Sequence, residues 1–350
     1  MFTAYHFILY LLLISTILIS YKKGEEKFFW GLVAIMIFFA GLRYSGDYTD
    51  LGVYLYYYQT GEEIDQGFGT GAIHWGFKAL NIVVGGLGLP FQFLLFIIAF
   101  FIYFTYAKYI RNNSPNKLLS LTIFYLTGFV FSLILLRQFI AVCIGLKAFQ
   151  YVIKRKQIAF LITVGVALLF HFTALVLLPV YYLYGIRPSK KNLLILFVSF
   201  IGIILAFNVV ALYMASFSEY YAHYIGKETE SSIVRLFMKI YIMAIYIFSL
   251  KKCAIEKNIN FLLLICLALN VIIYAGGSAV FGLFRLRTYF EISEIIGIPV
   301  ILLYARSLSS GYRMLTRGLV FVYFILLILS FDRMVNNTDI IYTTDYHWCF

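Results

Sequence analysis

Long apolar runs alternate with short polar connections along the whole chain. Most runs hold about 15 to 20 residues, the length of a helix that crosses a bilayer. They lack the residue-by-residue alternation of transmembrane β-strands, so the pattern predicts an all-α, polytopic membrane helical bundle. The expected spans lie near residues 2–21, 28–42, 89–107, 118–135, 138–153, 192–214, 232–250, 258–275, 288–304 and 318–331.

One interval is too short for the two full spans that it must hold. About 30 residues separate Lys156 from Arg187, and both belong to basic connections. Each crossing needs roughly 20 helical residues. We therefore expect two short helices that turn back part-way, with His171 near the turn, where protein or water must line the backbone. With this hairpin, about twelve transmembrane or re-entrant segments are predicted.

Composition agrees with a membrane protein. Apolar residues make up 63% of the chain and charged residues 13%, with a mean hydropathy of +0.90. Soluble domains carry about 25% charged residues. The net charge of +12 is spread over six connections between spans, each with three Lys or Arg. Positive connections favour the cytoplasm, which puts both termini outside, and no basic face indicates nucleic acid as a partner.

No composition shift or internal repeat divides the chain, so residues 1–350 are expected to form one integral membrane domain. Its largest extensions are an outer loop, 43–88, and an outer tail, 332–350. Within the loop, residues 75–84 are expected to form a short interfacial or re-entrant helix. The first apolar run lacks a basic leader and a small-residue cleavage site, which indicates a retained span. The four cysteines have no paired spacing that would indicate disulfides or a zinc site.

Six cations lie away from the basic connections, near the outer ends of different spans: Arg43, Arg137, Arg235, Lys239, Arg285 and Arg287. A charge inside the hydrocarbon costs roughly 2.5–3.5 kcal/mol, so each of these needs a partner. Arg235 and Lys239 are four residues apart and would repel one another on one helix face unless an anion lay between them. An anionic ligand and local ion pairs are the two explanations of this set.

Local partners exist for some of these groups. Arg287 has Glu291 four residues later and Glu294 seven later, and Arg43 has Asp47 four later. Arg137 and Arg285 have no such neighbour, which makes them the stronger candidates for binding an anion. His171 is either a hydrogen-bonded core histidine or a functional group at the turn of the hairpin.

Four motifs occur in order: Gly41-Leu-Arg43 with Gly46-Asp47-Tyr48, Leu136-Arg137-Gln138, Leu169-Phe170-His171-Phe172-Thr173-Ala174-Leu175, and Arg285-Leu-Arg287-Thr-Tyr289-Phe290. Within this span pattern, the chain resembles the EpsG family of bacterial exopolysaccharide polymerases, related to Wzy-type O-antigen polymerases. The resemblance covers roughly Phe28 to Leu303. Ser45 stands where a longer Gly-Thr-Asp-Tyr pattern is expected.

The resemblance implies a GT-C-like glycosyltransferase that needs no cofactor and no obligatory metal. Such an enzyme joins undecaprenyl-diphosphate-linked oligosaccharide repeat units at the outer face of the bacterial cytoplasmic membrane. Besides that substrate and the lipid bilayer, a flippase and a chain-length regulator are candidate partners. The expected diphosphate ligands are Arg43, Arg137, Arg235, Arg285 and Arg287. Asp47 or His171 is the expected base, and Tyr48, Gln138 and Tyr289 are expected to contact the substrate.

Two other functions are compatible with the same residues. A polysaccharide transporter or lipid flippase would place polar groups at the bilayer midplane, often on paired broken helices. Here the unpaired charges gather toward one side and only one broken hairpin is expected. An outer-face ligase that passes the glycan to another acceptor would need the same arginines.

Overall fold

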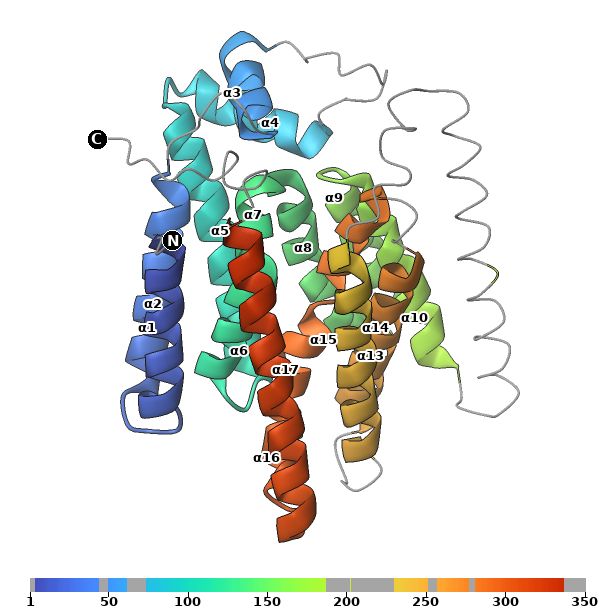
Figure 1. Ribbon diagram of the computed structural model, residues 1–350. Coiled ribbons are helices and arrows are strands. Elements are labelled where there is room, and N and C mark those ends of the chain that lie inside the picture. Colours follow the sequence, from blue (N-terminus) through green and yellow to red (C-terminus); the bar gives the residue numbers. More distant parts are fainter. Residues whose placement is uncertain are drawn as a thin grey trace.

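A computed structural model describes residues 4–43, 50–61, 74–186, 202, 230–250, 257–276 and 281–336, and every regular element in these ranges is a helix (Figure 1). The elements of the first half are α1 (Ala4–Ile19), α2 (Glu25–Gly41), α3 (Asp50–Thr60), α4 (Trp75–Gly86), α5 (Phe91–Asn113), α6 (Lys117–Phe124), η1 (Tyr125–Phe129), α7 (Val130–Ile134), α8 (Leu136–Ile153), α9 (Gln157–Leu168), η2 (Phe172–Leu177) and α10 (Leu178–Gly185). Those of the second half are α13 (Glu230–Leu250), α14 (Lys257–Gly276), η3 (Phe281–Tyr289), α15 (Ile292–Ile295), α16 (Gly297–Ala305) and α17 (Ser310–Asn336).

Four helices in the described ranges are long and apolar enough to cross a membrane: α5, the continuous helix α6–η1–α7, α8 and α17. Shorter apolar helices surround them, among them α1 and α9. The prediction of an all-α, helical membrane protein is therefore confirmed. The count of about twelve segments and the GT-C likeness stay predictions, and the expected span 192–214 lies outside the residues that can be described.

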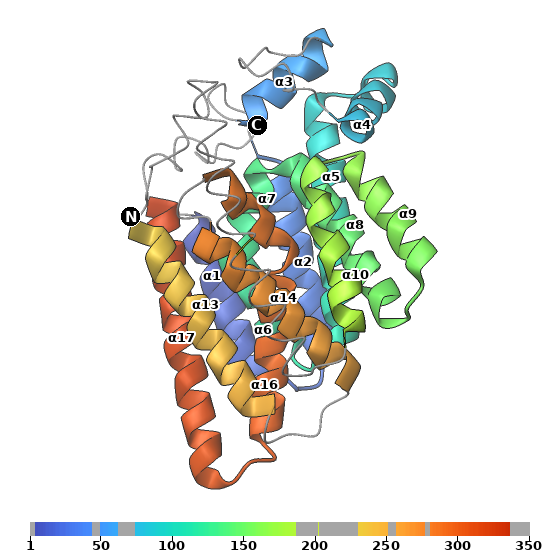
Figure 2. The ribbon, with the colours of Figure 1, turned by 90° about the vertical axis from the view of Figure 1, so that its right-hand side faces the viewer.

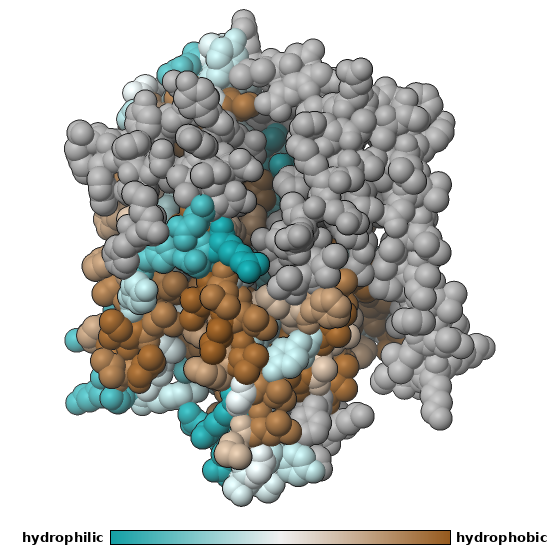
Figure 3. Space-filling view, viewed as in Figure 1, coloured by the Kyte–Doolittle hydropathy of each residue, from teal (hydrophilic) through white to brown (hydrophobic). Residues whose placement is uncertain are grey.

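The surface agrees with a bilayer environment. Figure 3 shows an apolar belt around the face of the bundle that carries α17, with hydrophilic side chains above and below it. Large apolar side chains point outward in this protein, among them Ile17 at 77% exposure and Phe321 at 65%. Water would oppose such exposure, whereas lipid tails accept it.

The expected hairpin is present between the basic connection at 154–156 and residue 186. α9 has 12 residues, about 18 Å at 1.5 Å per residue, which is less than a roughly 30 Å hydrocarbon core. His171 precedes η2 directly and α10 runs back beside α9 (Figure 2). At the lower end of the hairpin, Arg155 donates to the carbonyl of Tyr181 at 2.7 Å and lies over its ring.

The outer loop contributes two helices above the bundle, α3 and α4 (Figures 1 and 2). The expected helix at 75–84 is confirmed as α4. Gly76 joins it to the hairpin, because its amide donates to the carbonyl of Leu169 at 2.7 Å. A Cβ at this position would lie 2.9 Å from that oxygen, so only glycine permits the contact. The start of α4 is thereby docked on the turn of the hairpin.

The single span expected near 288–304 is wrong in form. The chain there is divided into the 3₁₀ helix η3, the short helix α15 and the helix α16. Residues 287–299 are nevertheless all buried, including the polar side chains of Thr288, Glu291, Ser293 and Glu294. Partners on several neighbouring helices draw these side chains in different directions, which one straight helix could not satisfy. α16 begins at Gly297, and Pro299 lies in its first turn, where proline is tolerated.

A second irregularity lies opposite this broken segment. The five residues of η1 form a π-helical turn within the continuous helix Lys117–Ile134. Gly128 lies in this turn, and a Cβ there would be 3.4 Å from a carboxylate oxygen of Glu291. π-Helical turns often occur at functional sites. Here the missing side chain lets a buried carboxylate approach the central helix.

Candidate functional site

Polar side chains gather in two places among the described helices. We call the first the buried ion network; it consists of Lys239, Asn270, Tyr274, Arg287, Glu291, Glu294 and Tyr323. We call the second the apex cluster, because it surrounds the turn of the hairpin; it consists of Tyr54, His74, Arg137, His171 and Arg285. The two places adjoin through η3, which supplies one arginine to each.

Lys239 and Glu294 form the centre of the buried ion network. Their side chains are 5% and 0% exposed, and the ammonium group of Lys239 contacts a carboxylate oxygen of Glu294. Tyr323 also donates to this carboxylate, as does Asn270 at 3.3 Å. Four elements, α13, α14, α15 and α17, meet at one carboxylate. The sequence suggested an anion between Arg235 and Lys239, but the structure gives Lys239 a partner within the chain.

Arg287 has the local partner that the sequence left open. Its Nε lies 3.4 Å from a carboxylate oxygen of Glu291, and both side chains are nearly inaccessible. The guanidinium group also donates to the hydroxyl of Tyr274 and lies 4.4 Å from the ring centre of Phe131. Arg287 is therefore part of an internal ion pair rather than an open anion site.

A small cavity of about 30 Å³ lies beside Arg287, between Lys239, Tyr274 and Glu291. It has room for about two water molecules. A pocket for a small ligand usually measures about 300–1,000 Å³. The buried ion network can therefore hold water but not a lipid diphosphate.

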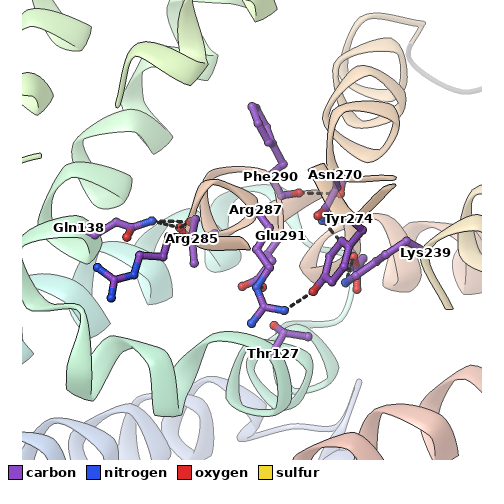
Figure 4. Close-up of polar contacts among 12 residues, drawn as sticks. Thr127, Gln138, Lys239, Asn270, Tyr274, Arg285, Arg287, Phe290 and Glu291 are labelled. Atoms are coloured by element: carbon purple, nitrogen blue, oxygen red, sulfur yellow. Dashed lines mark hydrogen bonds and ion pairs between the residues drawn. The ribbon is translucent and has the colours of Figure 1, made fainter. Parts of the chain in front are cut away.

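The turn of η3 separates its two arginines. A 3₁₀ helix has three residues per turn, so residues two apart point in different directions. Figure 4 shows the guanidinium group of Arg285 directed toward α8, away from Arg287, which points to Tyr274. The sequence analysis placed both arginines on one diphosphate. The structure does not bring them together.

Gln138 joins the two elements that carry the remaining arginines. Its amide nitrogen donates to the carbonyl of Arg285 and, at 2.9 Å, to the hydroxyl of Thr288 (Figure 4). Because Gln138 follows Arg137 directly in α8, these bonds fix η3 next to Arg137. Gln138 is only 1% exposed. It was expected to contact substrate, but its side chain supports the position of Arg285.

Arg137 and Arg285 are the half-buried arginines of the apex cluster. Arg137 donates to the hydroxyl of Tyr54 at 3.3 Å and lies 5.3 Å from the centre of its ring. The elements that carry the two arginines, α8 and η3, both pack against η2, which begins directly after His171. No carboxylate in the described part of the chain lies within ion-pairing distance of either one. Two guanidinium groups from different elements are therefore available to an anion.

His171 is held by stacked rings and by hydrogen bonds. Its ring stacks on that of His74, with centroids 5.3 Å apart, and on Phe172 at 5.1 Å. Its Nδ1 lies 2.7 Å from the hydroxyl of Thr173, and this hydroxyl lies 3.2 Å from that of Tyr289. Tyr289, expected to contact substrate, is 1% exposed and instead supports His171 through Thr173.

His74 was not expected at this site, because nothing in its sequence neighbourhood distinguishes it from a loop residue. Its Nε2 accepts a hydrogen bond from the amide of Phe172 at 3.1 Å. Burial lowers the pKa of His74, and the charge of Arg137 lowers it further. His74 therefore joins the loop 43–88 to the turn of the hairpin.

The hydrogen bonds of Arg43 are made outside the apex cluster. Its guanidinium group donates to the carbonyls of Ala40 and Leu133, each at 2.5 Å, and the residue is 7% exposed. These carbonyls belong to the last turns of α2 and α7, which cations favour. Arg43 therefore joins two helix ends. Asp47 and Tyr48 lie outside the described residues, so a pair between Arg43 and Asp47 cannot be described. Arg235 lies in α13, but its side chain is not among those described.

The described residues contain no group of three or more His, Cys, Asp or Glu that could hold a metal ion. Cys143 and Cys266 are buried free thiols.

The family relationship is visible over most of the sequence. A model of the EpsG family matches residues 26–341. No curated protein and no solved structure gives a significant match. The matched range includes both the apex cluster and the buried ion network. The chain therefore belongs to the EpsG family.

Proposed function

We propose that this protein is a polysaccharide polymerase that joins undecaprenyl-diphosphate-linked oligosaccharide repeat units. Membership of the EpsG family indicates an exopolysaccharide polymerase acting in a membrane. The finer proposal rests on one observation: Arg137 and Arg285 come from α8 and η3, which both pack against η2 next to His171, and neither pairs with a described carboxylate. Arginine binds phosphate oxygens through two parallel hydrogen bonds, so the pair suits a diphosphate.

The site is proposed to face the outside of the cytoplasmic membrane. Four of the six basic connections lie in described regions, and these four, α1–α2, α5–α6, α8–α9 and α16–α17, lie toward the lower end of the bundle (Figure 1). Basic connections favour the cytoplasm. The connection between α7 and α8, which precedes Arg137, lies at the opposite end (Figure 1). This arrangement supports an enzyme that uses substrate already delivered to the outer leaflet.

In the proposed reaction, an acceptor sugar hydroxyl attacks the anomeric carbon of the donor glycan. A new carbon–oxygen bond forms while the bond to the lipid diphosphate breaks, and the leaving diphosphate takes the electron pair. The hydroxyl proton passes to a base. Arg137 and Arg285 stabilise the charge that grows on the leaving oxygen, and so lower the barrier more than they strengthen substrate binding.

Arg43 and Arg287 are proposed to support the fold. Their guanidinium groups are engaged with main-chain carbonyls and with Glu291, respectively. Removing Arg137 or Arg285 takes away a charge-assisted hydrogen bond, each about 1.5–3 kcal/mol. At 1.36 kcal/mol per factor of ten, this corresponds to a roughly 10- to 150-fold loss of rate per arginine.

The test is chain extension in cells that lack their own copy of the gene and carry a variant. Arg137→Ala and Arg285→Ala should each accumulate single lipid-linked repeats in the outer leaflet and make much less long glycan, in line with the roughly 10- to 150-fold loss of rate. Lys147→Ala is the matched control, since Lys147 lies on the same helix as Arg137 but is exposed, and should extend chains normally. Repeats stranded in the inner leaflet would indicate a flippase instead. Long glycan lacking only its transfer to a final acceptor would indicate a ligase.

A further inference from the structure

The hydrogen bonds at the turn of the hairpin define which ring nitrogen of His171 carries the proton. The main-chain amide of Thr173 donates to Nδ1 at 3.3 Å. An amide can only donate, so Nδ1 must offer its lone pair. The Thr173 hydroxyl also lies 2.7 Å from Nδ1. Because Nδ1 already accepts from the amide and carries no hydrogen, the hydroxyl must be the donor in this second contact. Both the imidazolium and the tautomer with hydrogen on Nδ1 are thereby excluded.

Tyr289 completes this assignment. With its hydrogen directed at Nδ1, the Thr173 hydroxyl accepts from the hydroxyl of Tyr289 at 3.2 Å. The chain of donors therefore runs from Tyr289 through Thr173 to His171. All three residues are at least nine-tenths buried. In low-dielectric surroundings such a chain holds one tautomer, the one with hydrogen on Nε2.

The consequence is that the free nitrogen of His171 is a hydrogen-bond donor. No residue in the described ranges accepts a hydrogen bond from Nε2. The ring plane is fixed by stacking on His74 and Phe172. α8 and η3, which carry Arg137 and Arg285, both pack against η2, which begins directly after His171. Guanidinium groups can only donate hydrogen bonds. Three donors carried by different segments, His171, Arg137 and Arg285, thus suit an anion.

We propose that His171 donates a hydrogen bond from Nε2 to the leaving diphosphate, with Thr173 and Tyr289 as positioning residues, and that it is not the base. This deepens the proposed function and rests on it. The donor sugar loses its bond to the diphosphate oxygen, which keeps the electron pair and receives the Nε2–H hydrogen bond. The proton of the acceptor hydroxyl passes to a carboxylate, and Asp47 is the carboxylate that the sequence analysis names as a candidate base. No proton is transferred to His171, so its Nδ1 stays engaged throughout.

Three substitutions separate a donor from a base, using full-length protein in liposomes with a lipid-diphosphate-linked repeat unit. The side-chain amide of His171→Gln places an N–H near the position of Nε2 but cannot accept a proton. That of His171→Asn reaches only the position of Nδ1. We expect His171→Gln to extend chains within roughly tenfold of the wild-type rate, a difference of about 1.4 kcal/mol. His171→Asn and His171→Ala should lose about 10²–10³-fold, as does removal of one oxyanion donor.

The result that overturns the inference is a Gln variant as inactive as the Ala variant, which is the behaviour of a missing base. Equal, undiminished activity of all three variants would also overturn it. A readout independent of activity is ¹⁵N NMR of histidine-labelled wild-type protein, with the His171 signals assigned from the Gln variant. We expect a protonated Nε2 and an unprotonated Nδ1; the reverse would refute the inference even if the protein polymerises. Wild-type protein that extends no chains would instead refute the proposed function.

Discussion

The pair formed by Lys239 and Glu294 provides a quantitative test of how the bundle holds α15 in place. Lys239→Met removes the ammonium group and keeps most of the side-chain length. The carboxylate of Glu294 is 0% exposed and would retain only two neutral donors, Tyr323 and Asn270. Breaking a buried ion pair from one side costs about 3–5 kcal/mol, because the other charge stays buried without compensation.

The reciprocal change, Glu294→Gln, should cost a similar amount, since it leaves the ammonium group of Lys239 beside neutral partners. The double variant removes both charges and should therefore be more stable than the sum of the two losses predicts. We expect a coupling free energy of about 2 kcal/mol or more, toward the upper part of the range measured for residues in contact. Lys147→Met is the control, because Lys147 is exposed on α8.

The assay is unfolding of the purified protein in mixed detergent micelles by increasing SDS, followed by circular dichroism. Single variants within 1 kcal/mol of wild type would refute the reasoning, since the buried charge would then be compensated by other groups. Strict additivity in the double variant would show that the two side chains do not interact in the folded protein.

Two further predictions concern helix packing and the lower end of the bundle. Gly41→Ala should lower the free energy of unfolding by about 1–3 kcal/mol, because its Cβ would lie 3.0 Å from the backbone of α5. The control is Gly31→Ala on the same helix, whose Cβ would meet nothing within 4 Å, so that this variant should be neutral or stabilising. Equal effects of the two substitutions in thermal unfolding would contradict this prediction. Hydrogen bonds from Lys117, then Trp30 and then Arg111 hold the pKa of Glu26 at about 2, below its usual 4.5. The stabilisation by Glu26 is therefore full above pH 4.5 and is lost as pH falls toward 2. Because these side chains are partly exposed, Glu26→Gln should cost less than about 1 kcal/mol at neutral pH, and a difference from wild type that persists at pH 2 would refute the assignment.

The sequence predicts a helical membrane bundle because length and apolarity largely decide whether a helix can cross lipid. Four of its expected spans, near 89–107, 118–135, 138–153 and 318–331, correspond to helices long and apolar enough to cross a membrane. It also predicts the hairpin, because about 30 residues between two basic connections are too few for two full crossings. It fails at 288–304, where one straight span was expected. The buried partners of Glu294 include residues more than 20 positions away, Asn270 and Tyr323. Only the tertiary arrangement brings these groups together.

The candidate site shows the same limit. Sequence spacing identifies Arg137 and Arg285 as cations without a local acidic partner, and neither pairs with a described carboxylate. Spacing gives Arg287 a local partner in Glu291, but it does not show that Arg285 and Arg287 point in different directions, because that depends on the 3₁₀ turn of η3. Nor can it find His74, which reaches His171 through the docking of α4 on Leu169. The roles of Gln138 and Tyr289 as internal supports likewise follow from burial.

The most direct test of the central claim is chain extension by the purified protein in liposomes with a defined undecaprenyl-diphosphate-linked repeat unit. The wild-type protein is predicted to give a ladder of glycans and to release free lipid diphosphate, while the Arg137→Ala/Arg285→Ala double variant gives neither and remains monodisperse. A wild-type protein that makes no ladder, or a double variant that makes the same ladder, would contradict a diphosphate site at these two arginines.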